Sequence, residues 1–265
     1  MNLAFPYRET WLHRVNPTHK LAVSALLFVL VLLTHDPNVM LLLAVAALLP
    51  LALFTGHPPL RLLLYASPFL LLFVSSASGM MMFGSGETVW FKYGLIRITE
   101  ESFYRGLHLG FRSLQVAAVG LAFALTTRPV ALFYSLMQQL RLPPRYAYSF
   151  LAAFNMLPLL AEEFVTLRQA LQIRGGRRPR GLRGLYERLR LYAIPLLAQC
   201  IRRAHRTAAA MEAKRFASGA GSRTYYYRYS LSAADAGYAL YVLASTLLAW
   251  QLGQQWPLLP VRSVI

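Results

Sequence analysis

The apolar residues of this chain are gathered into long blocks, and this grouping limits the possible folds more than any other feature. Charged residues make up only 14% of the chain, whereas about a quarter is usual in a soluble domain. Long apolar blocks with few charges are typical of helices that cross a bilayer. The sequence therefore predicts an all-α polytopic membrane protein.

We expect about five transmembrane helices, separated by turns that contain Pro, Gly or Asn. They cover residues 20–33, 39–54, 60–83, 99–127 and 233–252. The first two blocks are shorter than the roughly 20 residues of a perpendicular span, so they borrow flanking residues or lie in a thinned bilayer. Pro68 should kink the third helix. Thr99 is the expected N-cap of the fourth helix, because two acidic residues follow it in the first turn.

Positive charge is concentrated between residues 141 and 230. This segment holds 17 Lys and Arg but only four Asp and Glu, which is +13 of the formal net charge of +17. Lys and Arg beside membrane spans mark the cytoplasmic side. We expect two or three amphipathic cytoplasmic helices here, at residues 129–140, 145–174 and 182–215. The chain is thus divided into N-terminal membrane helices (1–127), a basic cytoplasmic region (128–230) and a C-terminal membrane helix (231–265).

No motif in the sequence carries catalytic chemistry. The phosphate-binding loop GxxxxGK[ST], the zinc motif HExxH and the nucleophile elbow GxSxG are all absent. Cys200 is the only cysteine, which excludes an intramolecular disulfide and a metal site built on cysteines. No recognisable nucleic-acid-binding module accompanies the basic segment. We therefore expect no catalytic residue, no cofactor, no metal site and no nucleic-acid partner.

Two predicted helices end with a cation on the apolar stripe. Arg174 follows Leu171 by three residues and so continues the stripe of its helix. Met211 is followed by Lys214 and Arg215, at three and four residues, on its own face. The helix macrodipole favours a C-terminal cation by about 0.3–1 kcal/mol, so one such end has a structural explanation. Two such ends fit better with helices that lie in grooves of a partner and are held there by charge.

A second set of charged residues lies on the fourth predicted span. Their spacings of four, three and four place them on one helical face: Glu101, Arg105, His108 and Arg112. Charges on a membrane helix usually face a protein interior or water. Two interpretations stay open, namely a polar seam that contacts another subunit, and interfacial snorkelling with a Glu101–Arg105 pair. The glycine pair Gly106 and Gly110 on this helix favours close helix packing.

Several of these motifs together resemble the transmembrane T component of energy-coupling factor transporters, a family related to the cobalt-transport permease. The resemblance covers almost the whole chain, through residues 12–21 (LHRVNPTHKL), 94–102 (GLIRITEES), 125–129 (LTTRP) and the two helix ends. In that family, triplets similar to Ala-Arg-Gly end two long cytoplasmic coupling helices. These helices dock into grooves of two ABC-type ATPases.

By position, the two triplets of this chain are Ile173-Arg174-Gly175 and Ala213-Lys214-Arg215. The first differs from the family form only by Ile in place of Ala. The second has Lys where Arg is expected and Arg where Gly is expected. This difference matters because Arg clasps a carboxylate with a planar fork, whereas Lys offers a point charge. Either Lys214 or Arg215 can therefore be the working cation of the second end.

The resemblance implies a scaffold that links two ATPase subunits to a separate substrate-binding membrane subunit. The complex would import a vitamin, a vitamin precursor or a transition metal ion across the plasma membrane of a prokaryote, and hydrolysis would occur in the ATPases. The alternative is a membrane anchor whose basic segment binds anionic lipid. A self-sufficient secondary transporter would show an inverted repeat and broken helices, and neither is clear in the sequence.

Overall fold

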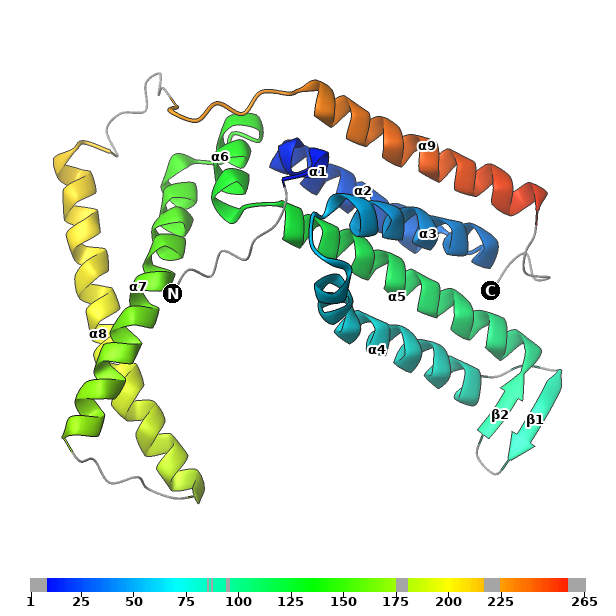
Figure 1. Ribbon diagram of the computed structural model, residues 1–265, viewed down its shortest axis with the longest axis horizontal. Coiled ribbons are helices and arrows are strands. Elements are labelled where there is room, and N and C mark those ends of the chain that lie inside the picture. The colour runs from blue at the N-terminus through cyan, green and yellow to red at the C-terminus, as the bar shows by residue number, and fades with distance from the viewer. Residues whose placement is uncertain are drawn as a thin grey trace. The chain divides into compact units, whose positions relative to one another are not determined.

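The computed structural model describes residues 9–84, 86, 88–93, 96–174, 181–216 and 225–256 (Figure 1). The described part is almost entirely helical. Its helices are α1 (Trp11–Arg14), α2 (Pro17–Leu33), α3 (Pro37–Phe54), α4 (Pro59–Phe83), α5 (Glu100–Thr126), α6 (Pro129–Gln139), α7 (Pro144–Ile173), α8 (Gly181–Ala213) and α9 (Ala233–Gln255). The chain divides into two compact units, one of Met1–Ser135 with Tyr229–Ile265 and one of Leu136–Arg228.

The first unit is a bundle of long apolar helices, in which α5 packs on α3 and α4, and α9 packs on α3 (Figure 1). Among the described residues, four helices are long and apolar enough to cross a membrane, namely α3, α4, α5 and, in the second unit, α7. The 17-residue α2 is a shorter apolar helix. The prediction of an all-α polytopic membrane protein is confirmed. The prediction also counted α2 and α9 as spans, and it assigned α7 to the cytoplasmic region.

Proline and capping residues set where these helices begin. Proline occupies the first turn of α2, α3 and α4, where its missing N–H would be unpaired anyway. The Thr99 side chain accepts a hydrogen bond from the Ser102 N–H at 3.2 Å, and Glu100 and Glu101 follow it in the first turn of α5. The predicted cap of the fourth span is therefore confirmed. Pro68 lies inside α4, as the sequence predicts.

The Gly106–Gly110 pair brings α5 into close contact with α4. A Cβ atom on Gly106 would lie 2.7 Å from the carbonyl oxygen of Ala77, and one on Gly110 would lie 2.8 Å from the Phe73 ring. Both distances are too short for real carbon contacts, so only glycine allows this separation. The helix packing predicted from the glycine pair is confirmed. Between α4 and α5, strands β1 (Val89–Tyr93) and β2 (Ile96–Thr99) form an antiparallel hairpin.

The second unit is built on α7 and α8, which cross one another (Figure 1). Near the crossing, the Arg203 guanidinium donates to the Glu163 carboxylate at 2.6 Å. A second contact joins Tyr148, near the start of α7, to Phe216, just beyond the end of α8, with ring centroids 5.2 Å apart. The two helices therefore run antiparallel, and their C-terminal ends lie at opposite ends of the pair.

Candidate functional site

The first helix tip is the C-terminal end of α7, where Ile173 and Arg174 are both exposed. Ile173 is the last residue of the helix and 87% of its surface is accessible. Arg174 is the C-cap, and its N–H donates to the carbonyl oxygen of Ala170 at 3.1 Å. Gly175, the third member of the predicted triplet, lies outside the described residues. An apolar and a cationic side chain are thus presented together at the end of α7.

The second helix tip is the C-terminal end of α8, which closes with a Schellman motif. The Phe216 N–H donates to the Met211 carbonyl at 3.0 Å, and the Arg215 N–H donates to the Glu212 carbonyl at 2.8 Å. Arg215 has a φ of 52°, in the left-handed region. This is the C′ position, which is usually glycine.

This backbone conformation supports the register of the second triplet. The family resemblance places Arg215 where glycine is expected, and Arg215 adopts the conformation for which glycine is the usual residue. Lys214, at the middle position of the triplet, precedes it as the C-cap and is exposed. The second tip therefore presents two consecutive cations, and the Arg215 backbone costs about 1–2 kcal/mol relative to glycine.

The two tips are far apart. Tyr148, which contacts Phe216 at the second tip, lies 26 residues before Arg174 along the same helix. At 1.5 Å per residue this corresponds to about 40 Å along α7. At this separation the two tips do not form one compact site.

Between the tips, many large apolar side chains of α7 and α8 are exposed in the described part of the structure. On α8 the exposed fractions are 61% for Leu185, 66% for Leu189 and 60% for Leu197. On α7, Phe150 and Leu157 are 54% and 58% exposed. Large apolar side chains exposed in this number are typical of a surface that contacts a protein partner or lipid.

The four residues of the predicted seam on α5 have different surroundings. Glu101 accepts a hydrogen bond from the Thr88 hydroxyl at 2.9 Å, Arg105 is half-buried, and His108 is only 6% exposed. Arg112 donates to the carbonyl oxygens of Val31 and Leu32, at 3.0 and 2.7 Å. The structure thus brings Arg112 onto the C-terminal end of α2. Whether the seam also meets another subunit stays a prediction.

Lys20 makes the reciprocal contact at the other end of the same helix pair. Its ammonium group donates to the carbonyl and hydroxyl oxygens of Thr126, the last residue of α5, both at 3.2 Å. Lys20 is only 2% exposed. The antiparallel helices α2 and α5 are therefore joined at each end by a cation that satisfies C-terminal carbonyl groups.

Beside Lys20 lies a cluster of buried polar side chains that we call the junction: Asn16, Thr18, Ser135 and Asp235. All four are less than 7% exposed. The Asn16 N–H donates to the Asp235 carboxylate at 2.6 Å, and the Thr18 and Ser135 hydroxyls are 2.5 Å apart. Asn16 and Thr18 belong to a motif that carried the family resemblance, but the sequence patterns did not single out Ser135 or Asp235. For Asp235, a signal was available: Ser232 precedes it by three residues, which is the spacing of a capping box at a helix start.

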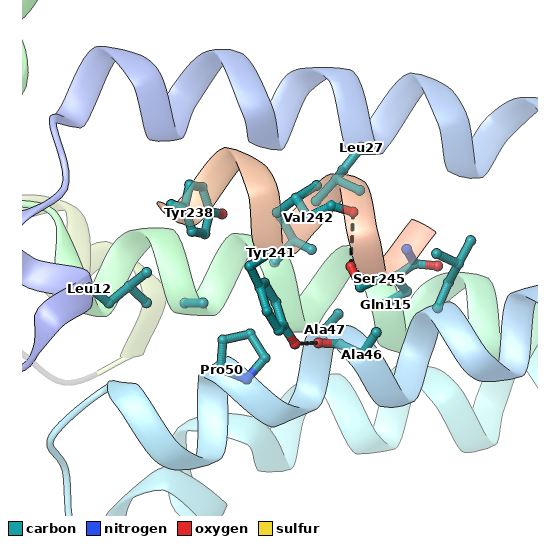
Figure 2. Close-up of a pocket in the computed structure, with 13 residues that line it drawn as sticks. Leu12, Leu27, Ala46, Ala47, Pro50, Gln115, Tyr238, Tyr241, Val242 and Ser245 are labelled. Carbon is teal, nitrogen blue, oxygen red and sulfur yellow. Dashed lines mark hydrogen bonds between the residues drawn. The ribbon is translucent and has the colours of Figure 1, made fainter. Parts of the chain in front are cut away.

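A cavity inside the first unit lies between α2, α3, α5 and α9 (Figure 2). Its volume is about 40 Å³, and one water needs about 10–15 Å³. The Tyr241 hydroxyl at its wall donates to the Ala46 carbonyl at 2.8 Å. Gln115 is 1% exposed, and its side-chain oxygen has no hydrogen-bond partner among the described residues. The cavity therefore has room for a few waters near Gln115, but not for a vitamin.

No cluster of His, Cys, Asp or Glu in the described residues could hold a metal ion.

Comparison with known proteins identifies the family of this architecture. The family model CbiQ, described as cobalt transport protein, matches residues 8–226. The energy-coupling factor transporter transmembrane protein EcfT of Lactococcus lactis is 25% identical over 250 residues, covering 91% of this chain and 92% of the relative. The EcfT protein of Exiguobacterium sibiricum is 28% identical over 191 residues, covering 68% and 72%. The chain therefore belongs to the CbiQ family of cobalt transport proteins, and it is a membrane component of an energy-coupling transporter.

Proposed function

We propose that this chain is the non-catalytic scaffold of an importer and that its two helix tips each dock one ATPase subunit. The observation that carries the proposal is the pair of exposed cationic tips at opposite ends of a crossed, antiparallel helix pair. A separation of about 40 Å suits two ATPases that lie side by side. Hydrolysis would take place in the ATPases.

The chemistry of the tips indicates what each groove contains. A helix that lays its apolar face into a groove is held by side chains spaced by three and four residues. Arg174, at the end of such a face, would bind a carboxylate with two parallel hydrogen bonds. We therefore expect each groove to combine an apolar floor with an acidic end.

The remaining parts follow from this assignment. The basic region 128–230 would lie on the cytoplasmic side of the membrane and partly in contact with it, since Lys and Arg are retained on that side during insertion, and residues 1–127 and 231–265 would form the membrane part. As the family resemblance implies, a separate membrane subunit would bind the substrate. The exposed apolar surface of α7 and α8 would be covered by that subunit and by lipid.

Alanine substitution at the tips tests the proposal. The chain is co-expressed with its two ATPases and purified by a tag on this chain. Arg174→Ala or Lys214→Ala should each lower the recovery of ATPase, and the double variant should abolish it while the chain remains in the membrane. Arg190→Ala, which removes an exposed cation within α8, is the matched control and should change nothing. Recovery of both ATPases at wild-type yield by the double variant would refute the proposal.

The competing function is a membrane anchor that holds anionic lipid through the same basic region. Salt distinguishes the two, because binding to a charged surface weakens as ionic strength rises. A helix in a groove retains its apolar contacts, so the ATPases should stay bound in 0.5 M salt. The transported substrate is then sought by uptake into vesicles that contain the full complex, with Co²⁺, Ni²⁺, thiamine, biotin and riboflavin as probes.

A further inference from the structure

The junction lies where the chain passes between its two units. The first crossing is within α6, directly after Ser135, and the second is before α9, between Arg228 and Tyr229. Ser135 is the last residue of the first unit before the first crossing, and Asp235, in the first turn of α9, belongs to the same unit shortly after the second crossing. Both covalent connections between the units are thus fastened to the membrane helices by the same cluster.

The Ser135 hydroxyl uses its full hydrogen-bonding capacity. It donates to the Asn16 side-chain oxygen and accepts from the Thr18 N–H at 3.3 Å and from the Thr18 hydroxyl. A hydroxyl has one donor and two acceptor sites, so all three are occupied. Ser135 has no exposed surface. This side chain therefore attaches α6 to the start of α2 in one defined arrangement.

Asp235 attaches α9 to the same place. One carboxylate oxygen accepts from the Asn16 N–H at 2.6 Å, and the other accepts from the Ser232 N–H at 2.7 Å. Lys20 is near enough to interact electrostatically with this buried carboxylate. Because Lys20 also binds the last residue of α5, the ends of α2, α5 and α9 meet the middle of α6 around one set of polar contacts.

We propose that Ser135 and Asp235 are positioning residues that transmit ATP-driven motion from the coupling helices to the membrane helices. This inference rests on the proposed function. Any displacement of α7 or α8 that is carried along the chain passes through α6 or through the segment before α9. Buried hydrogen bonds from Ser135 and Asp235 hold both connections in a defined geometry. A displacement of α6 therefore moves the ends of α2, α5 and α9 together.

The variants Ser135→Ala and Asp235→Asn test this role. Ser135→Ala removes all three hydrogen bonds of the hydroxyl. Asp235→Asn leaves one acceptor oxygen and removes the charge. Ser149→Ala is the matched serine control, since the exposed Ser149 hydroxyl donates to the Arg145 carbonyl of the same helix, α7. Asp36→Asn is the matched carboxylate control, because Asp36 precedes α3 without a side-chain cap bond. Thr18→Val, which keeps the shape of the side chain, is a milder junction variant in case Ser135→Ala does not fold.

The experiment measures two properties of the full complex in nanodiscs. The first is the amount of ATPase that co-purifies with this chain. The second is the change in amide hydrogen exchange at residues 16–20 and 233–236 when ATP and vanadate are added. We expect the wild type and both controls to bind ATPase and to show at least a twofold exchange change. The junction variants should bind ATPase within twofold of the wild type and lose the exchange change.

Each other result has a defined meaning. A junction variant that keeps the exchange change, or that loses the ATPases as well, would overturn the positioning role. A wild-type complex whose amides at these residues do not respond to ATP and vanadate would overturn it too. A wild-type chain that fails to recover any ATPase would instead overturn the proposed function, so the two failures are distinguishable.

Discussion

Cations lie at helix C-termini in both units of this protein, but the two units use them differently. In the first unit, which we call the membrane unit, Lys20 and Arg112 bind the terminal carbonyl groups of α5 and α2. Lys20 is almost fully buried. In the second unit, which carries most of the positive charge, Arg174 and Lys214 follow the last residues of α7 and α8 and are exposed. The same residue type at the same kind of helix position thus joins helices within the chain in one unit and stays accessible in the other.

The difference shows what distinguishes a structural cation from a docking cation. A helix C-terminus attracts positive charge in either case, by about 0.3–1 kcal/mol, so sequence position alone does not separate the two. Burial and an internal acceptor from another helix identify the structural cations. Exposure at the end of an uncovered apolar face identifies the candidates for docking. The same substitution should therefore lower stability in the first unit and leave it unchanged in the second.

The largest effect on stability should come from Lys20→Met. This change leaves the Thr126 carbonyl without its buried donor and removes the positive charge near Asp235. An unsatisfied buried acceptor costs about 1–3 kcal/mol, so the melting temperature in detergent should fall by several degrees. Lys214→Met at the exposed tip should leave the melting temperature unchanged. Equal melting temperatures for both variants would remove the distinction between the two kinds of cation.

The next largest effect should be on the affinity for the ATPase subunits, and it should differ between the two tips. Arg174→Lys keeps the charge but loses the planar fork, so binding of the first ATPase should weaken by about tenfold. Lys214→Arg should leave binding at the second tip unchanged or tighten it. Titration of purified ATPase against each variant measures both. A strong loss of affinity in Lys214→Arg would mean that the register of the second triplet is displaced by one residue.

Local sequence patterns predicted those features that depend on neighbours along the chain. The helix boundaries, the Thr99 cap and the close packing at Gly106 and Gly110 follow from helical spacing and residue type. The positions of Arg174 and Lys214 at helix ends follow from the same patterns. Each of these features is decided within about one or two turns of helix.

Features that depend on distant residues were not predictable from the sequence. Lys20 and Thr126 are 106 residues apart, and Asn16 and Asp235 are 219 apart. The spacing of residues along one helix does not show which other helix end a lysine will bind. The seam illustrates the limit, because Arg112 shares a face with Glu101 in the sequence pattern but bonds the end of α2 in the structure.

A smaller effect should follow from Arg215→Gly at the second tip. Glycine adopts a φ of 52° without steric cost, so this change should stabilise the end of α8 by about 1 kcal/mol. Hydrogen exchange of the Phe216 amide, which closes the Schellman motif, should slow by about fivefold. Arg215→Ala keeps the strained backbone and should show no such slowing. If both variants lower ATPase affinity equally, Arg215 is the working cation of this tip and Lys214 is not.

The smallest effect should be a pH dependence of the stability of the first unit, which comes from His13 in α1. Burial lowers the pKa of His13 below its usual value of 6.5, and the nearby Lys20 lowers it further. Below pH 6.5 the unfolded chain therefore binds a proton that the folded chain does not, so stability falls as the pH falls. His13→Gln removes the titrating group and should flatten this dependence between pH 7.5 and 5.5, measured as melting temperature in detergent. An identical slope in both proteins would assign the acid sensitivity to other groups.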